Sequence, residues 1–362
     1  MTGTEAATAA STTGLRAVVV DDSQFMRTVI GDMLEDDGIS VVDTASDGES
    51  GVEAVKAHEP DVVTMDLKMP NVDGIEAVDR IMSEQPTPVL VLSAHADDGA
   101  ELTFEAMDRG AVDFFEKPSG EVSVGIKQQQ ETLISKVRSV ASANVNATGA
   151  AAKHTPAATS QSGRTYPNRP TLVIGSSTGG PTVVEGVLSE LPLEADFRVL
   201  IVQHMPDGFT ERFAERLDGV SDYSVREASD GDRLGGGEAL VAKGGKHLEV
   251  SGYGGGRIRV TLTEDEPEHN VRPAADVTLR TAADRIDGPL VAAVLTGMGA
   301  DGADGVRSVS DAGGAVVAQD EETSAVFGMP KRAIETGVVE EIRPQNELVE
   351  GILTAITIQQ KR

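Results

Sequence analysis

A serine flanked by glycines is the residue of this chain best placed to act as a nucleophile. Ser177 stands in the run Gly175-Ser-Ser-Thr-Gly179, after an apolar strand-like segment and before apolar residues at helical spacing. A glycine turn between a strand and a helix exposes a hydroxyl and directs backbone amides toward an anion. The pattern suits a nucleophile elbow, a phosphate-binding loop, or a turn selected only for its backbone geometry.

A serine hydroxyl becomes strongly nucleophilic only when a base takes its proton, so a nearby histidine decides between these interpretations. His204 directly follows the apolar run 199–202 and is therefore expected at the same sheet edge as Ser177. We expect His247 and His269, in or beside a glycine-rich hairpin region, to be surface residues. The other histidines lie in the N-terminal part and in a linker: His58, His95 and His154. His204 is the candidate base.

The base needs a carboxylate to orient it, and Asp301 follows another apolar run, 290–295. Asp304 remains possible by position alone. Three glycines before and after Asp301 leave backbone amides uncovered, which suits oxyanion donors: Gly297, Gly299 and Gly302. No pair of histidines has the spacing of zinc ligands, so the sequence does not favour a zinc hydrolase.

A second group of chemically suited side chains lies in the N-terminal part. Asp21 and Asp22 follow its first strand-like run, and Asp66 follows its third. Ligands of open parallel sheets bind beyond the carboxyl ends of the strands, so these carboxylates are expected to converge. Clustered oxygen ligands with room for water suit Mg²⁺, which would attract a phosphate donor. Ser93 and Lys117 would add a hydroxyl and a positive charge.

Strand-like runs alternate with helical patterns before and after a polar stretch, which predicts parallel sheets covered by helices on both faces. The expected strands are 17–20, 61–65, 88–92, 172–174, 199–202, 290–295 and 315–318. We predict an α/β fold with two doubly wound domains, the first flavodoxin-like and the second carrying a β-hairpin between Gly235 and Gly256. The predicted divisions are 15–138, a flexible linker over 139–169, and 170–362.

Composition excludes several classes of function. The formal charge is −28, with 27 acidic and 13 basic residues in 1–169 and 32 and 18 in 170–362. Neither part has the basic surplus that nucleic acid binding requires. The absence of cysteine excludes disulfides and thiolate sites. No apolar run approaches a membrane span and the N-terminus does not resemble a signal peptide, so we expect a cytoplasmic protein without membrane insertion.

The N-terminal motifs resemble the receiver domain of response regulators. They are Val-Val-Val-Asp-Asp-Ser, Thr-Met-Asp-Leu-Lys-Met-Pro-Asn-Val-Asp-Gly, Leu-Ser-Ala and Glu-Lys-Pro, in this order. The resemblance implies that Asp66 is phosphorylated and that Asp22, Asp66 and the carbonyl of Lys68 hold Mg²⁺ with Asp21 beside them. It also implies that Ser93 and Lys117 contact the phosphate. Phe114 stands where that family has its aromatic switch residue.

The C-terminal motifs resemble the catalytic domain of chemotaxis protein-glutamate methylesterases, the CheB family. They are Ile-Gly-Ser-Ser-Thr-Gly-Gly, Gln-His-Met-Pro-Asp-Gly-Phe, Leu-Thr-Gly-Met-Gly-Ala-Asp-Gly and Val-Phe-Gly-Met-Pro. The resemblance makes Ser177 the nucleophile, His204 the general base and acid, and Asp301 its orienting residue. Thr178 and the amide of Met298 would lie near the oxyanion. Ser176 adds a neighbouring hydroxyl, and the central position in the elbow favours Ser177.

Together the two resemblances imply a phosphorylation-regulated esterase that hydrolyses glutamate methyl esters on methyl-accepting chemoreceptors, releases methanol and deamidates receptor glutamines. A chemotaxis histidine kinase would supply the phosphoryl group, and the receiver would cover the Ser177 cleft until Asp66 is phosphorylated. We expect a monomer with Mg²⁺ in the receiver and no cofactor for ester hydrolysis. The alternative is a response regulator whose output domain binds a nucleotide or partner without covalent chemistry; a DNA-binding output domain conflicts with the acidity.

Overall fold

The computed structural model describes residues 14–93, 96–117, 126–145 and 166–359. The first part of the chain forms a five-stranded sheet in the order β2-β1-β3-β4-β5, in which every pair of neighbours is parallel. The strands are β1 (Arg16–Val20), β2 (Ser40–Ala45), β3 (Val62–Asp66), β4 (Val89–Ser93) and β5 (Asp113–Glu116). The order reverses between β1 and β3, so the ends of these two strands form the expected ligand site of a flavodoxin-like sheet.

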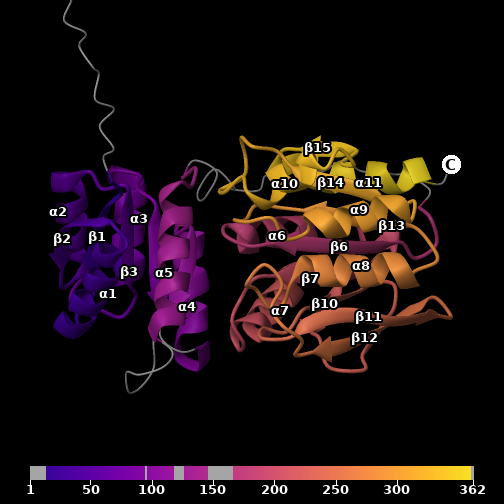
Figure 1. The fold of residues 1–362 in the computed structure, drawn as a ribbon, viewed down its shortest axis with the longest axis horizontal. Coiled ribbons are helices and arrows are strands. Elements are labelled where there is room, and N and C mark those ends of the chain that lie inside the picture. Colours follow the sequence, from indigo (N-terminus) through magenta and orange to yellow (C-terminus); the bar gives the residue numbers. More distant parts are fainter. Residues whose placement is uncertain (1–13, 94–95, 118–125, 146–165, 360–362) are drawn as a thin grey trace, which may run out of the picture.

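In the part of the chain that the structure describes, five helices cover this sheet: α1 (Gln24–Asp36), α2 (Gly48–His58), α3 (Gly74–Glu84), α4 (Ala96–Asp108) and α5 (Ile126–Ala141). The first three begin at side-chain caps, in which Ser23, Asp47 and Asp73 accept a backbone N–H from the first turn. In Figure 1, α4 and α5 lie on the side of this domain that faces the second part of the chain.

The second part forms a seven-stranded, entirely parallel sheet in the order β15-β14-β13-β6-β7-β10-β8. Its strands are β6 (Thr171–Ser176), β7 (Arg198–Gln203), β8 (Ser224–Glu227), β10 (Glu238–Val241), β13 (Leu290–Val294), β14 (Ala315–Gln319) and β15 (Glu341–Arg343). The order reverses between β6 and β13, which again makes the edge beyond these strands a ligand site.

Among the described residues, six helices pack on this sheet: α6 (Gly180–Glu190), α7 (Phe209–Val220), α8 (Ala275–Arg285), α9 (Ala303–Asp311), α10 (Met329–Glu335) and α11 (Leu348–Gln359). Short 3-10 turns occupy Leu193–Ala195 and Gln345–Glu347. Strand β6 is buried on both faces, with Leu172 and Ile174 in one apolar cluster and Val173 in another. Burial on both faces explains why this strand is continuously apolar. The predicted fold class, two doubly wound α/β domains, is confirmed.

The glycine-rich middle of the second part contains more structure than the predicted hairpin. Strands β11 (His247–Gly254) and β12 (Arg257–Thr263) pair antiparallel, and the short β9 (Arg233–Leu234) joins them. The turn at Gly255 and Gly256, both with positive φ, lies where a hairpin was expected. Strand β10, from the same region, instead joins the parallel sheet.

Helix α5 extends into the range that was predicted as linker. Helix α5 continues to Ala141, with Val140 buried, so residues 139–141 are helical although they were assigned to the linker. Residues 146–165, the greater part of the predicted linker, lie outside the described residues, as do His95, His154 and the N-terminal residues up to 13.

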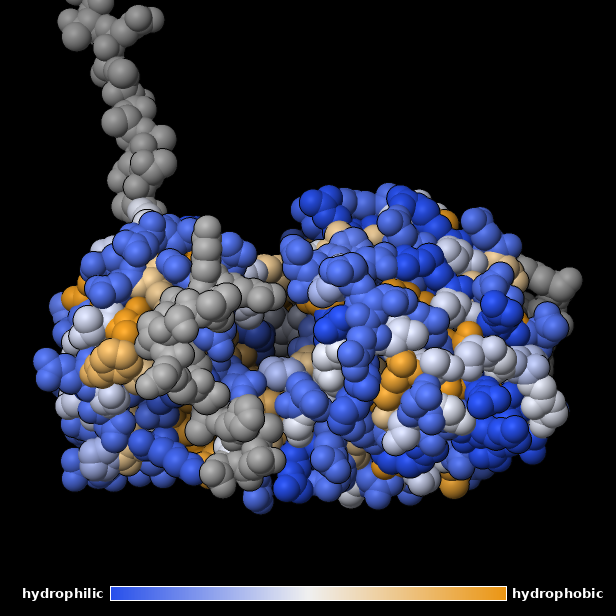
Figure 2. Space-filling model, turned by 60° about the horizontal axis from the view of Figure 1, so that its bottom comes forward, coloured by the Kyte–Doolittle hydropathy of each residue, from blue (hydrophilic) through white to orange (hydrophobic). Residues whose placement is uncertain are grey.

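No helix among the described residues is both long and apolar enough to cross a membrane. Figure 2 shows one face of the molecule on which hydrophilic residues predominate and apolar residues are scattered.

Candidate active site and phosphoacceptor site

Ser177 lies in the turn between β6 and α6, where its backbone is fixed on both sides. Its amide donates to the carbonyl of Thr296 (3.0 Å), and its carbonyl accepts from the Gly180 amide and from Gln203 Nε2, both at 2.8 Å. Gly179 has a φ of +74°, in the region that favours glycine. A Cβ on Gly180 would lie 2.2 Å from Gln203 Oε1. The glycines are therefore required for the turn that presents Ser177.

The two neighbouring serines have different surroundings. Ser176 is fully buried and its hydroxyl donates to Gln203 Oε1 at 2.6 Å. Ser177 is only partly buried. A substrate can therefore reach the Ser177 hydroxyl, whereas the Ser176 hydroxyl has a structural hydrogen bond.

His204 follows β7 directly and pairs with Asp301, as the strand-end argument predicted. His204 Nε2 lies 2.7 Å from Asp301 Oδ2, and the His204 amide donates to the carbonyl of Ser176 at 3.1 Å. This places the imidazole beside the turn that holds Ser177. Among the described residues, no hydrogen bond joins the Ser177 hydroxyl to His204. Because His204 Nε2 pairs with Asp301, Nδ1 is the ring nitrogen left to accept the Ser177 proton.

Asp301 is held as an anion at the N-terminus of α8. It is 1% exposed and accepts from the amides of Ala275 (2.6 Å) and Asp276 (2.9 Å). Burial by itself would raise the pKa of Asp301, but the hydrogen bond to His204 and the two amides outweigh burial and lower that pKa below its ordinary value. An ionised Asp301 can orient His204 and stabilise its imidazolium form.

The loop after β13 passes directly against the nucleophile turn. A Cβ on Gly297 would lie 2.7 Å from Ser177 Cβ, so only glycine allows this approach. Met298 follows, with its side chain 40% exposed. Its amide therefore lies on a segment in contact with Ser177, consistent with the position expected of an oxyanion donor.

The first domain contacts this site through β5. Asp113 Oδ2 accepts a hydrogen bond from the hydroxyl of Thr178 (2.7 Å) and pairs with Lys136 Nζ (2.8 Å). The ring of Phe114 stacks on Phe209 of α7, with centroids 4.4 Å apart. The predicted switch residue and the residue next to the nucleophile therefore both belong to the contact between the domains.

The three predicted carboxylates converge at the end of the first sheet. One oxygen each of Asp21, Asp22 and Asp66 lies within 4.8 Å of the others. Asp21 and Asp66 are nearly fully buried, and Lys117 Nζ lies 2.7 Å from the former and 2.8 Å from the latter. Burial, aided by the charge of Asp21, raises the pKa of Asp66 although Lys117 opposes this. An all-oxygen set of two buried carboxylates and the exposed Asp22, with excess negative charge, fits Mg²⁺.

The remaining predicted residues lie around these carboxylates. The Lys68 amide donates to Asp66 Oδ1 at 3.4 Å, which places Lys68 beside the candidate phosphoacceptor. Ser93 ends β4, is fully buried, and its hydroxyl accepts from Thr103 at 2.7 Å. The amide of Lys117 donates to the Ser93 carbonyl at 2.8 Å, so these two residues are adjacent.

Among the described residues, no hydrogen bond joins the other histidines to Ser177, and one prediction about them was wrong. His247 is 1% exposed: its Nδ1 accepts from the Ala274 amide and its Nε2 lies 3.2 Å from the Glu266 carbonyl. It is a core residue because the hairpin packs on α8. His269 is exposed, as expected, but pairs with buried Asp276 at 2.8 Å.

Comparisons with known proteins agree with this arrangement. A CheB methylesterase profile matches residues 172–352, and a response regulator receiver domain profile matches residues 17–124. A relative from Natronomonas pharaonis is 76% identical over 96% of this chain and 99% of its own. The chain belongs to the CheB methylesterase family. A second relative, from Haloarcula marismortui, is 56% identical over 95% of this chain and 98% of its own. Both relatives are named protein-glutamate methylesterase/protein-glutamine glutaminase.

A solved member of the family supports the fold of the second domain. The CheB methylesterase catalytic domain of Thermotoga maritima is 40% identical, with a TM-score of 0.50, and the match covers 52% of this chain and 98% of that domain. The two family profiles correspond to the two parallel sheets of the structure, one to each sheet.

Sequence reasoning missed three residues that support the sites. Gln203 links Ser176 to the Ser177 carbonyl, Asp113 reaches Thr178 from the other domain, and Asp276 binds Asp301 through its amide. Gln203 could have been found as a polar residue ending a buried strand, next to the candidate base. Asp113 and Asp276 depend on packing between distant elements, for which the sequence carries no local signal.

Proposed function

We propose that Ser177, His204 and Asp301 are the catalytic residues with which this chain hydrolyses glutamate methyl esters on methyl-accepting chemoreceptors and deamidates receptor glutamines. The chain is a protein-glutamate methylesterase/protein-glutamine glutaminase, since full-length relatives at high identity have this activity by name. The observation that carries the residue assignment is the His204–Asp301 pair at the sheet edge where Ser177 is accessible.

The proposed reaction is acyl transfer to serine followed by hydrolysis. Ser177 Oγ attacks the ester carbonyl carbon while His204 takes its proton, and Asp301 stabilises the imidazolium. The carbon–oxygen bond to the methoxy group then breaks, and His204 returns the proton so that methanol leaves. Water attacks the acyl-enzyme with His204 again as base, which releases the glutamate carboxylate and restores the hydroxyl. A glutamine side chain follows the same course and releases ammonia.

The negative charge of the tetrahedral intermediate needs donors beside Ser177. The amide of Met298, on the loop that contacts Ser177, and Thr178 are the proposed donors. The Thr178 hydroxyl donates to Asp113 when the domains are in contact, so it becomes available only when the receiver withdraws. The receiver thus acts on a residue of the catalytic centre as well as on access to it.

Control of the esterase is proposed to start at Asp66. Mg²⁺, when bound by Asp22, Asp66 and the Lys68 carbonyl with Asp21 beside them, would neutralise charge as a phosphoryl group reaches Asp66. A phosphorylated Asp66 is a new dianion that Lys117 and Ser93 can contact. Lys117 lies one residue beyond β5, the strand that carries Asp113 and Phe114. Movement of Lys117 toward the phosphate would therefore pull on the strand that holds the domain contact.

Replacement of Asp66 by asparagine is expected to abolish activation by a small phosphodonor and leave the unstimulated rate within about twofold. Asparagine cannot be phosphorylated but is close in size to aspartate. The test is release of labelled methanol from methylated chemoreceptor membranes, with and without acetyl phosphate, by the full chain. Asp61→Asn, an exposed carboxylate before β3, is the matched control. Unchanged stimulation in D66N would contradict control through Asp66.

Loosening the domain contact should activate the unphosphorylated enzyme. Arg216 of α7 donates to Asp108 of α4 at 2.7 Å and lies 5.8 Å from the Phe104 ring centroid. We expect Arg216→Ala to raise methanol release without phosphodonor by up to about fivefold. A partly exposed charged contact contributes about 0.2–1 kcal/mol, and its loss shifts the population of the closed state by the corresponding factor. Arg332→Ala, which removes a surface pair with Glu335 on α10, should have no effect. A fall in the unstimulated rate of R216A would contradict the proposed closed state.

The proposed partners are the chemoreceptor substrate and a chemotaxis histidine kinase as phosphodonor, in the cytoplasm, with the enzyme acting as a monomer. Neither membrane insertion nor nucleic acid binding is part of this proposal, and the charge of −28 argues against the second. A non-catalytic output domain, the alternative from sequence, is disfavoured by the family and by the His204–Asp301 geometry.

A further inference from the structure

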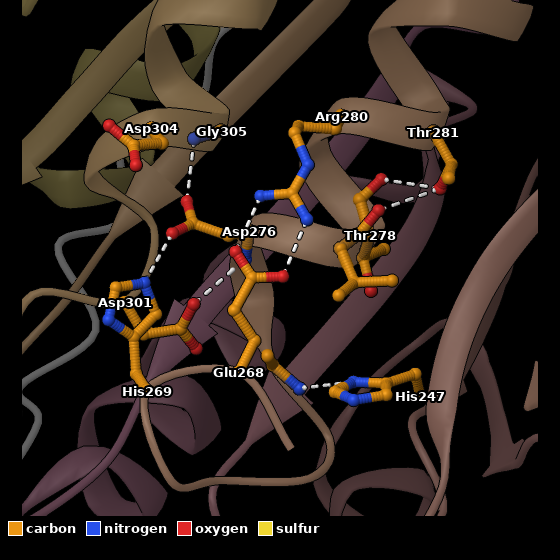
Figure 3. A network of polar contacts seen from close by, with 12 residues as sticks. His247, Glu268, His269, Asp276, Thr278, Arg280, Thr281, Asp301, Asp304 and Gly305 are labelled. Atoms are coloured by element: carbon orange, nitrogen blue, oxygen red, sulfur yellow. Dashed lines mark hydrogen bonds and ion pairs between the residues drawn. The ribbon is translucent and has the colours of Figure 1, made fainter. Parts of the chain in front are cut away.

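A second histidine–aspartate pair lies directly behind the first. His269 Nε2 is 2.8 Å from Asp276 Oδ2, and Figure 3 shows this pair beside Asp301 in one connected group of polar contacts. The imidazole of His269 has a third of its side-chain surface exposed, whereas Asp276 is fully buried. The reaction proposed above uses neither residue.

Asp276 connects the second pair to the catalytic centre. Its amide donates to Asp301 Oδ1 (2.9 Å), and its own Oδ1 accepts from the Gly305 amide (2.6 Å) at the start of α9. The Asp276 carboxylate thus joins the first turns of two helices, and its backbone holds the residue that orients His204. A shift in the position of Asp276 would therefore act on Asp301 through the hydrogen bond from the Asp276 amide.

Two buried carboxylates in this position repel one another unless a cation compensates one of them. Burial and the charge of Asp301 raise the pKa of Asp276, although the Gly305 amide and His269 oppose this. For His269, partial burial lowers the pKa, but the contact with Asp276 and the charges of Asp301 and Glu268 outweigh burial and raise it. His269 is therefore favoured as the cation that compensates Asp276.

The remaining charged groups around His269 are already paired. Arg280 of α8 donates to both oxygens of Glu268, at 2.7 and 2.6 Å, and Asp304 of α9 is exposed and pairs with Arg307. Glu268, His269 and Asp276 have ligand atoms within 4.8 Å of one another, as a metal site would. Since Arg280 holds Glu268 and the Gly305 amide holds Asp276, we assign a hydrogen-bond network and no metal here.

We propose that His269 is a positioning residue of the esterase. As a cation, it balances the charge of Asp276, so that His204 faces the single negative charge of Asp301. The proposal rests on the catalytic assignment of the preceding section. Without His269, an extra negative charge would remain near His204. This charge favours the imidazolium form and moves the protonation of the catalytic pair to higher pH.

The test compares His269→Gln with the double variant His269→Gln/Asp276→Asn in the full chain. We expect the acidic limb of the kcat/KM profile for methanol release to move up by about one pH unit in H269Q, with KM unchanged, as one uncompensated charge nearby would produce. The double variant removes both charges and should return the limb to its wild-type position. His58→Gln is the matched control, because His58 pairs with Asp43 at 3.2 Å on the other domain.

The titration of His204 can also be followed by NMR of histidine-labelled protein, which has six histidines and needs no substrate. A midpoint that moves up in H269Q and returns in the double variant supports the proposal. An unmoved midpoint, or a double variant as displaced as the single one, overturns it. If H269Q fails to fold, His269→Lys retains the charge and should keep the wild-type midpoint; a displaced midpoint there overturns the proposal as well. Persistence of activity in a Ser177 variant would instead contradict the catalytic assignment, without affecting this titration.

Discussion

Replacement of Ser177 by alanine is expected to lower kcat for methanol release by on the order of 10⁴-fold or more, because the acyl-enzyme can no longer form. The same variant should lose glutaminase activity, since both reactions are proposed to start with Ser177 Oγ. The measurement is labelled methanol released from methylated receptors by the phosphodonor-stimulated enzyme. Alanine fits the site without strain because the turn is fixed by backbone contacts of Ser177, and the variant should retain its unfolding temperature.

Ser176→Ala is the matched control for this experiment. It removes a hydroxyl of the same type one residue away, but one that is buried and donates to Gln203. We expect a loss of about 1 kcal/mol in stability from the unsatisfied Gln203 oxygen and less than a tenfold change in kcat. The reverse pattern, an active S177A and an inactive S176A, would move the nucleophile to Ser176.

Replacement of Asp301 by asparagine should lower kcat by roughly 10³- to 10⁴-fold near neutral pH, as loss of the orienting carboxylate does in other serine hydrolases. The amides of Ala275 and Asp276 donate to different oxygens of Asp301, so asparagine can accept a hydrogen bond from only one of them. The imidazolium formed during catalysis would also lack its counter-charge. The depressed pKa of Asp301 also has a consequence for stability. The stabilisation that ionised Asp301 gives the folded state is present above the pKa of this group in the unfolded state. It is lost as the pH falls through the lower pKa of the folded state.

Asp304→Asn tests the other acid that position alone allowed. Asp304 is exposed and pairs with Arg307 within α9, so its loss should change kcat by less than twofold. Acid unfolding monitored by circular dichroism should show D301N to be less sensitive to a decrease in pH than the wild type, with D304N behaving as wild type. Equal kinetic losses in both variants would contradict the assignment of Asp301.

The strand ends could be predicted from sequence because the strands that carry them are buried on both faces. A continuous apolar run such as the one before Ser177 defines which residues form the strand. A polar residue directly after such a run must lie at the sheet edge. This reasoning predicts His204 and Asp301 at one sheet edge, where the structure joins them by a hydrogen bond. The short β5 and the partly exposed edge strand β2 lack such runs and were not predicted.

Packing between separate elements was beyond the reach of sequence patterns. His247 was expected on the surface because it lies in or beside a glycine-rich region, yet the hairpin places it in the core against α8. The hydrogen bond from Thr178 to Asp113 joins residues 65 positions apart in different domains. Such contacts depend on how two surfaces meet, and periodicity within one segment does not encode that.

The stacking of Phe114 on Phe209 has a thermodynamic consequence for adaptation. Suppose that two events both favour the arrangement in which the domains are apart. Thermodynamic linkage then requires that each event makes the other more favourable by the same free energy. If phosphorylation of Asp66 opens the cleft to a methylated receptor helix, then a receptor helix in the cleft must make phosphorylation of Asp66 more favourable by the same free energy. A heavily methylated receptor array would then raise the equilibrium fraction of phosphorylated enzyme, so that the substrate favours the active form of the enzyme that removes it.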